Sequence, residues 1–363
     1  MDHSNVFEQA DAGGVGSVTV AADRSAVITP VHSQPRRSPE ARPAEASVRT
    51  LDGLLRAAGF AVDPEGVWPL DGIGAMNHHW RVRIGGRDLV FREYGWPFLP
   101  PAPARARREA MVLELLECAD VPAPRGLAVS DNALLATFER GRVLGEMPMS
   151  EVAVALGDAW YDVGRAWRRV HEIVPPAEVR AGLLGGPQRE MAGWYDRVIA
   201  DVHRYLHAVE HERPELEVDA ARVHRLFVAA KGMLEARPVR LLHGDAHLWN
   251  VLVDLEADRW TCTAILDWEC AEAGDPVWDL VALHLLRRRD VGPTPQAFFD
   301  GYGDPGPAAV WALYELLHHL WQAIDVAAWP APLPSHRAAT EYLRALPGRL
   351  PRLENQVGPA RGS

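Results

Sequence analysis

Apolar residues recur along this chain with two different periods, and the change from one to the other divides it into two parts. Over residues 48–140, alternation of apolar and polar residues predicts short strands, two of which meet at Gly85-Gly86. This pair favours a tight hairpin, because such turns need positive φ angles. A second hairpin is predicted over residues 126–138, and helical spacing predicts helices over 48–58 and 105–117.

Beyond Gly145 the helical period dominates. Four long amphipathic segments are predicted as helices: 152–171, 194–211, 220–234 and 307–329. Two short apolar runs, 251–253 and 261–266, predict strands that pair around the polar residues between them. A further helix is expected to open at 275–280, and the C-terminal segment is expected to form one helix and a frayed end.

These patterns predict an α+β fold with two lobes, a small one on an antiparallel sheet and a larger, mainly helical one. The expected divisions are a disordered leader (1–47), the small lobe (48–140), the helical lobe (141–350) and a frayed tail (351–363). The leader is assigned as disordered because it is rich in Ala, Ser, Pro, Gly and charge and lacks apolar periodicity.

The composition is that of an ordinary soluble globular protein, with 48% hydrophobic and 24% charged residues. The net charge of −11 argues against nucleic acid as the main partner, because phosphate binding needs clustered basic residues. It is compatible with a cationic substrate. No apolar run approaches the ~18 residues that a membrane span requires, so no membrane partner is expected. The three cysteines form no CxxC pair, which favours a reducing compartment and a cytoplasmic location.

Three polar residues stand beside the paired strands expected after residue 240. Asp245 precedes Asn250 in a loop that leads into the run 251–253, and Asp267 follows the next apolar run. Carboxylate and amide oxygens suit Mg²⁺, which proteins usually hold with one or two groups and substrate phosphates. A remaining carboxylate can orient a substrate hydroxyl. These are the components of phosphoryl transfer.

The same region carries a family resemblance, from about residue 65 to about residue 290. The chain resembles the aminoglycoside phosphotransferase/choline kinase-like family in the following residues: His243-Gly244-Asp245, Asn250, Asp267-Trp268-Glu269, Gly274-Asp275-Pro276 and Asp279. Members of that family have a protein-kinase-like two-lobed fold and phosphorylate hydroxyl groups of small molecules. The resemblance therefore implies this fold and this type of reaction.

The resemblance also implies roles for the residues of the central loop. Asp245 is expected to be the catalytic carboxylate, which accepts the hydroxyl proton or orients the oxygen for attack. Asn250 and Asp267 are expected to hold Mg²⁺ against the nucleotide phosphates. His243 and Asp279 are expected to support the loop through hydrogen bonds.

In the small lobe, the resemblance places Gly72, Gly74 and Asn77 over the phosphates of ATP or GTP. A plain β-turn accounts for this glycine pattern about as well. Arg92 falls where protein kinases carry a phosphate-binding lysine, and Glu109 is expected to be its partner on the following helix. An arginine can take this role because it stays charged and can bridge a carboxylate and a phosphate. The alternative is an exposed arginine on an edge strand.

Four further acidic residues are candidates for contacts with the acceptor: Glu269, Asp275, Glu315 and Asp325. Asp275 precedes a proline and is equally typical of a turn. The preferred acceptor is an antibiotic, such as an aminoglycoside or another polar natural product, which makes the protein a resistance enzyme. The alternatives are a metabolic kinase for choline, an amino alcohol or a sugar, and a nucleotide-binding scaffold without activity.

Overall fold

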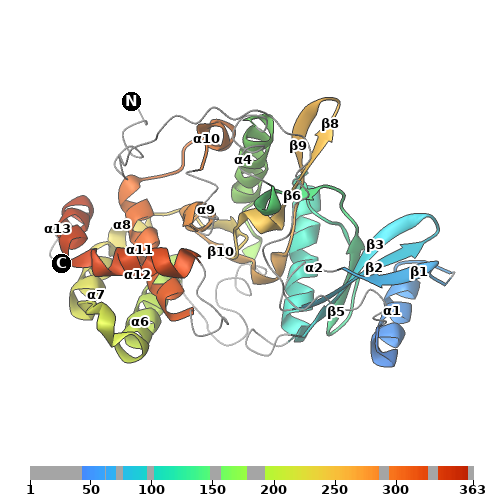
Figure 1. Cartoon of the computed structure of the whole chain (residues 1–363), viewed down its shortest axis with the longest axis horizontal. Coiled ribbons are helices and arrows are strands. Elements are labelled where there is room, and N and C mark those ends of the chain that lie inside the picture. Colours follow the sequence, from blue (N-terminus) through green and yellow to red (C-terminus); the bar gives the residue numbers. More distant parts are fainter. Residues whose placement is uncertain are drawn as a thin grey trace, which may run out of the picture.

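The chain folds into a small lobe built on an antiparallel sheet and a larger, mainly helical lobe (Figure 1). The computed structural model describes residues 43–61, 63–70, 77–95, 102–147, 157–177, 193–285, 294–325 and 334–358. The small lobe contains α1 (Glu45–Ala57), β1 (Gly66–Pro69), β2 (Asn77–Ile84), β3 (Arg87–Tyr94), α2 (Ala102–Cys118), β4 (Gly126–Val129) and β5 (Ala133–Thr137).

The small lobe is organised by its five-stranded sheet, in the order β1-β2-β3-β5-β4. Successive side chains of a strand point to opposite faces, so each strand serves both sides of the sheet. One face packs against α1 and includes Trp80, Val82 and Phe91. Gly85 and Gly86 both have positive φ and join β2 to β3, so this hairpin prediction is confirmed.

The other face of the sheet lies against α2. Tyr94 and Leu134 on this face belong to the same buried cluster as Leu113 and Leu116 of α2. Arg92 also points to this side, two residues before Tyr94 on β3, which aims a charged group at the region between the lobes.

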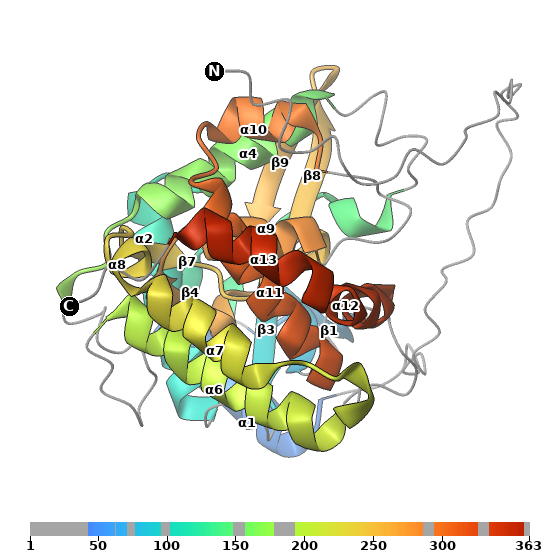
Figure 2. The same cartoon turned by 90° about the vertical axis from the view of Figure 1, so that its left-hand side faces the viewer.

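The helical lobe consists of α4 (Gly157–Glu172), α6 (Trp194–Glu212), α7 (Ala220–Ala229), α8 (Lys231–Glu235), α9 (Val277–Leu285), α10 (Gln296–Tyr302), α11 (Ala308–Asp325), α12 (Pro334–Arg344) and α13 (Leu346–Val357). Figure 2 shows α6, α7, α11 and α13 side by side at the end of the lobe that lies far from the sheet. They share an apolar cluster that includes Phe227 and Tyr314. Asp219 precedes α7 and caps it, because its carboxylate accepts from the backbone N–H of Arg222 (2.9 Å).

Short strands lie between α8 and α9, and two of them, β7 (Arg240–Leu242) and β8 (Val251–Glu256), flank the central loop of residues 243–250. β8 and β9 (Arg259–Ile265) form a hairpin, and β6 (Arg142–Val143) adds to its edge. β7 pairs with β10 (Glu272–Gly274). The predicted pairing of the two apolar runs is therefore confirmed.

Several expected elements differ at their ends. The segment expected as one helix over 220–234 divides at Ala230 into α7 and α8. The first described helix begins at Glu45, inside the expected leader, while residues 1–42 lie outside the described residues.

The expectation of one C-terminal helix and a frayed tail from 351 was wrong for residues 351–357, which belong to α13. Pro351 lies inside this helix although proline lacks a backbone N–H donor and disfavours a helix interior. Burial of Leu350 and Leu353 in the helical core and the ion pair of Arg222 with Glu354 (2.7 Å) favour the helix instead.

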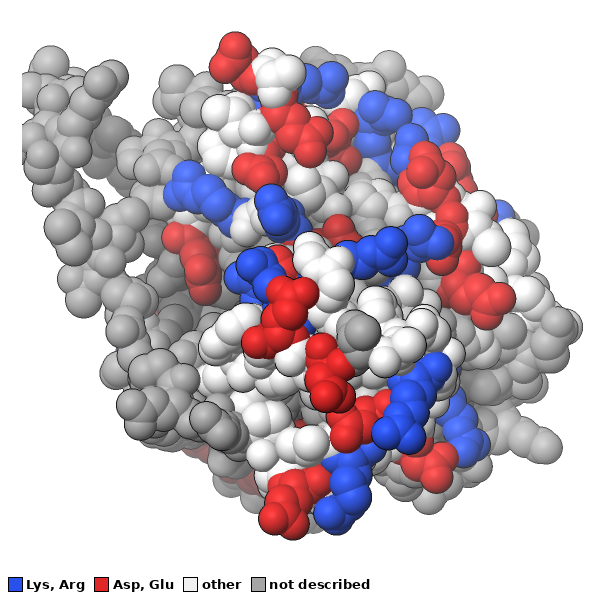
Figure 3. All heavy atoms as spheres, turned by 90° about the vertical axis from the view of Figure 1, so that its right-hand side faces the viewer, with Lys and Arg blue, Asp and Glu red and all other residues white. Residues whose placement is uncertain are grey.

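On the face of the molecule seen in Figure 3, basic and acidic side chains alternate over the surface. On this face the described basic residues do not gather into a single-sign patch of the kind that a nucleic-acid backbone requires.

Leu353→Ala tests whether α13 belongs to the core. The side chain of Leu353 is 6% exposed, so the substitution should lower the free energy of unfolding by about 2–4 kcal/mol. Leu255→Ala is the control, because Leu255 is 51% exposed and should change it by less than about 0.5 kcal/mol. Urea unfolding of both variants measures the difference; equal, small effects would show that α13 is dispensable.

Candidate active site

The central loop is held by a buried carboxylate from α9. Asp279 is fully buried, and its Oδ2 and Oδ1 accept from the backbone N–H groups of His243 (2.6 Å) and Gly244 (3.1 Å). His171 of α4 lies 3.2 Å from Asp279 Oδ2 through its Nε2, and its Nδ1 lies 2.9 Å from the hydroxyl of Tyr302. The start of the loop is thus fixed to three helices, α9, α4 and α10.

His243 connects this loop to the strand that precedes Asp267. Its Nδ1 accepts from the backbone N–H of Asp245 (3.2 Å), so its Nε2 carries the proton and donates to the carbonyl of Leu266 (2.7 Å). The ring lies between those of Trp167 and Trp268, with centroids 5.5 and 4.6 Å away. His243 and Asp279 thus both hold the backbone of this loop through hydrogen bonds.

Gly244 has φ +79°, in the left-handed region that favours glycine. A Cβ at this position would lie 2.1 Å from the carbonyl oxygen of Cys270. Two separate constraints therefore exclude a side chain between His243 and Asp245.

Asp245 faces the space between the lobes with 38% of its side chain exposed. Its Oδ2 lies 3.5 Å from Nε2 of His247. Burial disfavours the ionised carboxylate, but the charge and hydrogen bond of His247 outweigh it, so the pKa of Asp245 is lowered. No role was predicted for His247, which in the structure lies against Asp245 and lowers the pKa of its carboxyl group.

The pairing of β8 with β9 brings Asn250 next to Asp267. Val251 pairs with Ile265, and the backbone N–H of Leu266 donates to the carbonyl of Asn250 (2.8 Å). The side-chain Nδ2 of Asn250 donates to the carbonyl of Asp245 (3.1 Å). Among the described residues its other contact, to His247 at 3.4 Å, also uses Nδ2, which leaves the amide oxygen available.

Asp267 has φ +68°, so the chain turns sharply after β9 and presents this side chain, which is 28% exposed. Its Oδ1 accepts from Nη2 of Arg92 at 2.6 Å. Burial opposes ionisation, but the guanidinium of Arg92 outweighs it and lowers the pKa of Asp267 to about 2. Asp267 is therefore a carboxylate at any physiological pH.

Arg92 lies in the middle of a buried group of carboxylates. Its Nη1 donates to Glu109 of α2 (2.9 Å), and its Nη2 reaches Asp267 and also Glu269 Oε1 (3.0 Å). Glu109 also accepts from the hydroxyl of Tyr94 (2.5 Å). The pairing of Arg92 with Glu109 occurs as the resemblance implied, and Arg92 is 5% exposed, which excludes the alternative of an exposed edge arginine.

Two expected site residues have other partners. Asn77 is buried, and its Nδ2 donates to Glu269 Oε1 (2.8 Å) while its Oδ1 accepts from Arg105 (3.2 Å). Glu269 is 6% exposed and also accepts from Arg105 (2.9 Å). These contacts argue against a phosphate contact by the Asn77 side chain and an acceptor contact by Glu269. Gly72 and Gly74 lie outside the described residues.

Arg105, which is almost fully buried, was not among the predicted site residues. A signal was present, because Arg105 stands one helical turn before Glu109 and so shares its face of α2. The residues it joins are far apart in sequence, however, and only the folded chain brings Asn77 and Glu269 to it.

The remaining acidic candidates lie in the helical lobe. Asp275 is fully buried and accepts two hydrogen bonds from Arg237 (2.8 and 3.1 Å) and one from the hydroxyl of Tyr314 (3.0 Å). An acceptor contact by Asp275 would require these bonds to break, which argues against that role. Glu315 and Asp325 are on α11, with 31% and 27% of their side chains exposed.

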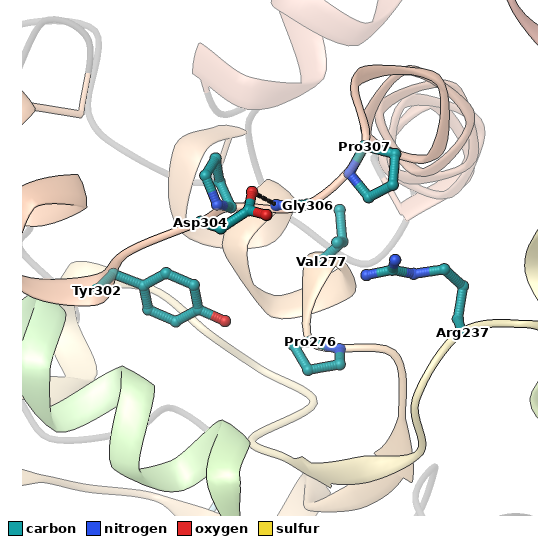
Figure 4. A pocket seen from close by; sticks show the side chains of 8 residues that line it. Arg237, Pro276, Val277, Tyr302, Asp304, Gly306 and Pro307 are labelled. Atoms are coloured by element: carbon teal, nitrogen blue, oxygen red, sulfur yellow. Dashed lines mark hydrogen bonds between the residues drawn. The ribbon is translucent and has the colours of Figure 1, made fainter. Parts of the chain in front are cut away.

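A pocket of about 330 Å³ lies beside the start of α9, lined by Arg237, Pro276, Val277, Tyr302, Asp304, Pro305, Gly306 and Pro307 (Figure 4). Figure 4 shows Arg237 and Tyr302 on opposite sides of it. None of the expected site residues that the structure describes lines this pocket, so it is separate from the group around Asp245.

Comparison with known proteins identifies the family. Residues 68–317, well over half of the chain, match the profile of the phosphotransferase enzyme family. The chain belongs to this family. A search of curated proteins finds no match. The matched region of the phosphotransferase family includes β2 to most of α11, and therefore the whole group around Asp245.

Solved structures share the fold of this phosphotransferase family member. The ADP-bound aminoglycoside phosphotransferase APH(2'')-Ib is 13% identical with a TM-score of 0.60, covering 84% of this chain and 98% of its own. The macrolide 2'-phosphotransferase MphH from Brachybacterium faecium is 21% identical with a TM-score of 0.53, covering 81% and 97%. The ethanolamine kinase of Plasmodium vivax is 13% identical with a TM-score of 0.54, covering 80% and 83%.

These likenesses confirm the expected two-lobed, protein-kinase-like α+β fold and the resemblance on which it rested. Among the described helices, none combines the length and the apolar character that a membrane crossing requires.

Gly244→Ala tests the two constraints on the loop. The substitution should cost the left-handed strain of about 1–2 kcal/mol and, in addition, the displacement of the Cys270 carbonyl. Gly86→Ala is a matched control, because Gly86 has φ +70° and open space around it. Urea unfolding should show a clearly larger loss of unfolding free energy for Gly244→Ala than for Gly86→Ala. Equal losses would mean that the loop can accommodate a side chain at position 244.

Proposed function

We propose that this protein transfers the γ-phosphate of ATP or GTP, with Mg²⁺, to a hydroxyl group of a small molecule. The observation that supports this most is the meeting of Asp245, Asn250 and Asp267 on one loop and the strand beside it, both braced by buried hydrogen bonds. Phosphoryl transfer depends mainly on positioning and charge neutralisation, and this arrangement supplies both.

The protein groups available to a cation are those that Mg²⁺ prefers. The amide oxygen of Asn250 and the carboxylate of Asp267 are hard oxygen ligands on neighbouring strand ends. No group of three or more His, Cys, Asp or Glu side chains able to hold a metal occurs among the described residues. When bound, Mg²⁺ would neutralise charge on the nucleotide phosphates. Asn250 and Asp267 would hold it with the phosphates completing its shell.

Asp245 would act on the acceptor. Its carboxylate is partly exposed and ionised, so it can accept a hydrogen bond from the acceptor hydroxyl and direct the oxygen toward the γ-phosphorus. As the new phosphorus–oxygen bond forms, the hydroxyl proton passes to Asp245, and the bond to the leaving nucleoside diphosphate breaks. His247 would keep the carboxylate ionised until then.

Arg92 would bind a nucleotide phosphate from the small lobe. Three of its five N–H donors are directed at carboxylates, and its buried Nε–H has no acceptor within the described residues, so the carboxylates do not use all of its donors. The pairing with Glu109 fixes the direction of the guanidinium. Gly72 and Gly74 remain proposed as the backbone cover of the phosphates.

For the acceptor we prefer an antibiotic, an aminoglycoside or another polar natural product. Enzymes of this fold include APH(2'')-Ib and the macrolide phosphotransferase MphH. The partly exposed carboxylates of Glu315 and Asp325 suit a cationic acceptor. The fold shared with an ethanolamine kinase supports a metabolic amino alcohol kinase as the second candidate. An inactive scaffold would be expected to lack part of the Asp245, Asn250 and Asp267 set.

A transfer screen tests this function directly. The purified protein, with Mg²⁺ and either ATP or GTP, is incubated with aminoglycosides, macrolides, choline, ethanolamine and sugars, and phosphorylated products are detected by mass spectrometry. We expect phosphorylation of an antibiotic; phosphorylation of the amino alcohols alone would favour the metabolic candidate. Nucleotide binding without any transfer would favour the scaffold.

Asp245→Asn tests the catalytic carboxylate. The variant keeps the shape of the side chain but cannot take the hydroxyl proton, so kcat should fall by about 10²–10⁴-fold. Nucleotide affinity should change by less than about threefold, because Asp245 is not expected to bind the nucleotide. Asp258→Asn, at the exposed tip of the β8–β9 hairpin, is the control and should keep full activity. Undiminished kcat in Asp245→Asn would remove the residue from this role.

A further inference from the structure

Glu269 joins the helical lobe to three separate elements of the small lobe. It lies two residues after Asp267, and its carboxylate accepts from Asn77 of β2, Arg92 of β3 and Arg105 of α2. The distances are 2.8, 3.0 and 2.9 Å. Because Glu269 is 6% exposed, these bonds lie in a medium where they are little screened by water.

Arg105 is the least expected member of this group. It is 1% exposed, and its Nη1 reaches Glu269 Oε2 and the side-chain oxygen of Asn77. Its guanidinium also lies 5.4 Å from the ring centre of Tyr94. A charge this deeply buried is retained only with good partners, and loss of one partner leaves the other uncompensated.

Arg105 acts on Arg92 by two routes. Glu269, which Arg105 holds through Oε2, contacts Arg92 through Oε1. Glu109, which contacts the other side of Arg92, stands one turn after Arg105 on the same helix. Rotation or displacement of α2 would therefore disturb both carboxylates that direct the Arg92 guanidinium.

The charges of this group indicate when the contact between Glu269 and Arg92 becomes important. Three carboxylates, Glu109, Asp267 and Glu269, face two guanidinium groups, Arg92 and Arg105, so the group carries one surplus negative charge. A cation held by Asp267 would compete with Arg92 for that carboxylate. Glu269 would then be the helical-lobe acceptor that keeps Arg92 in place.

We propose that Arg105 is a positioning residue that, through Glu269, holds the small lobe against the helical lobe with Arg92 directed at the nucleotide phosphates. The inference rests on the proposed function. It predicts that Arg105 contributes to nucleotide affinity although it does not touch the nucleotide.

The test measures the Kd of Mg²⁺ with β,γ-imido ATP and β,γ-imido GTP by calorimetry. Arg105→Met should raise Kd about tenfold or more, and Arg105→Lys, which keeps the charge, should restore part of the affinity. Arg107→Met is the matched control, since Arg107 is on the same helix in an exposed ion pair with Asp131 (2.6 Å). Its Kd should equal that of the wild type.

A double-mutant cycle separates this role from general stability. Glu269→Gln should also raise Kd, and the loss of binding free energy in the double variant with Arg105→Met should be clearly smaller than the sum of the two single losses. Additive losses would contradict coupling through Glu269. If Arg105→Met does not fold, the cycle is measured with Arg105→Lys in its place. It then consists of the two single variants, Arg105→Lys and Glu269→Gln, and the double variant that carries both. Circular dichroism establishes that each variant is folded at the temperature of the titration.

The possible outcomes distinguish the two proposals. Equal Kd for the wild type and a folded Arg105 variant would overturn the positioning role while leaving the proposed function intact. Absence of Mg²⁺-nucleotide binding by the wild type would overturn the proposed function, and the inference with it. Loss of affinity in Arg105→Met, with partial rescue by lysine and no loss in Arg107→Met, would support both.

Discussion

The carboxylate of Asp279 anchors the loop on which the candidate site is built. It accepts two consecutive backbone N–H groups, from His243 and Gly244, where the chain leaves β7 and cannot satisfy them within a strand. Hydrogen bonds to a charged acceptor contribute about 1.5–3 kcal/mol each, so this is a strong constraint on the loop. It fixes the loop before any ligand arrives.

Further hydrogen bonds fix the rest of the loop and connect it to the residues after β9. His243 fixes the backbone at Asp245 on one side and at Leu266 on the other. Asn250 returns to the loop through the carbonyl of Asp245. The backbone that carries Asp245, Asn250 and Asp267 is therefore positioned by hydrogen bonds from neutral side chains and backbone groups. The carboxylates of Asp245 and Asp267 lie against His247 and Arg92.

The part of the site that could be predicted from the sequence is the part encoded by local order. Asp245, Asn250 and Asp267 follow from short spacing and from strands that pair as neighbours, so register alone brings Asn250 to Asp267. The contact of Asn77 and Arg105 with Glu269 was not predictable in this way. It joins segments more than 160 residues apart, and it depends on how the two lobes pack. Likewise the sequence left Asp275 as a candidate for contact with the acceptor. In the structure its carboxylate is bound by Arg237, which lies 38 residues earlier in the chain.

The presence of arginine at position 92 has a consequence for how this protein can be studied. Burial opposes the charge of Arg92, but the surrounding carboxylates outweigh it and raise its pKa well above the ordinary value. Such a guanidinium does not lose its proton and is not a nucleophile, unlike an amine. An acylating reagent that reacts with a lysine amine would therefore find no target at position 92. The only lysine of the chain, Lys231, is on α8, outside the group of residues around Asp245. A labelling experiment that depends on lysine acylation would therefore give no signal from this site, whatever the site binds.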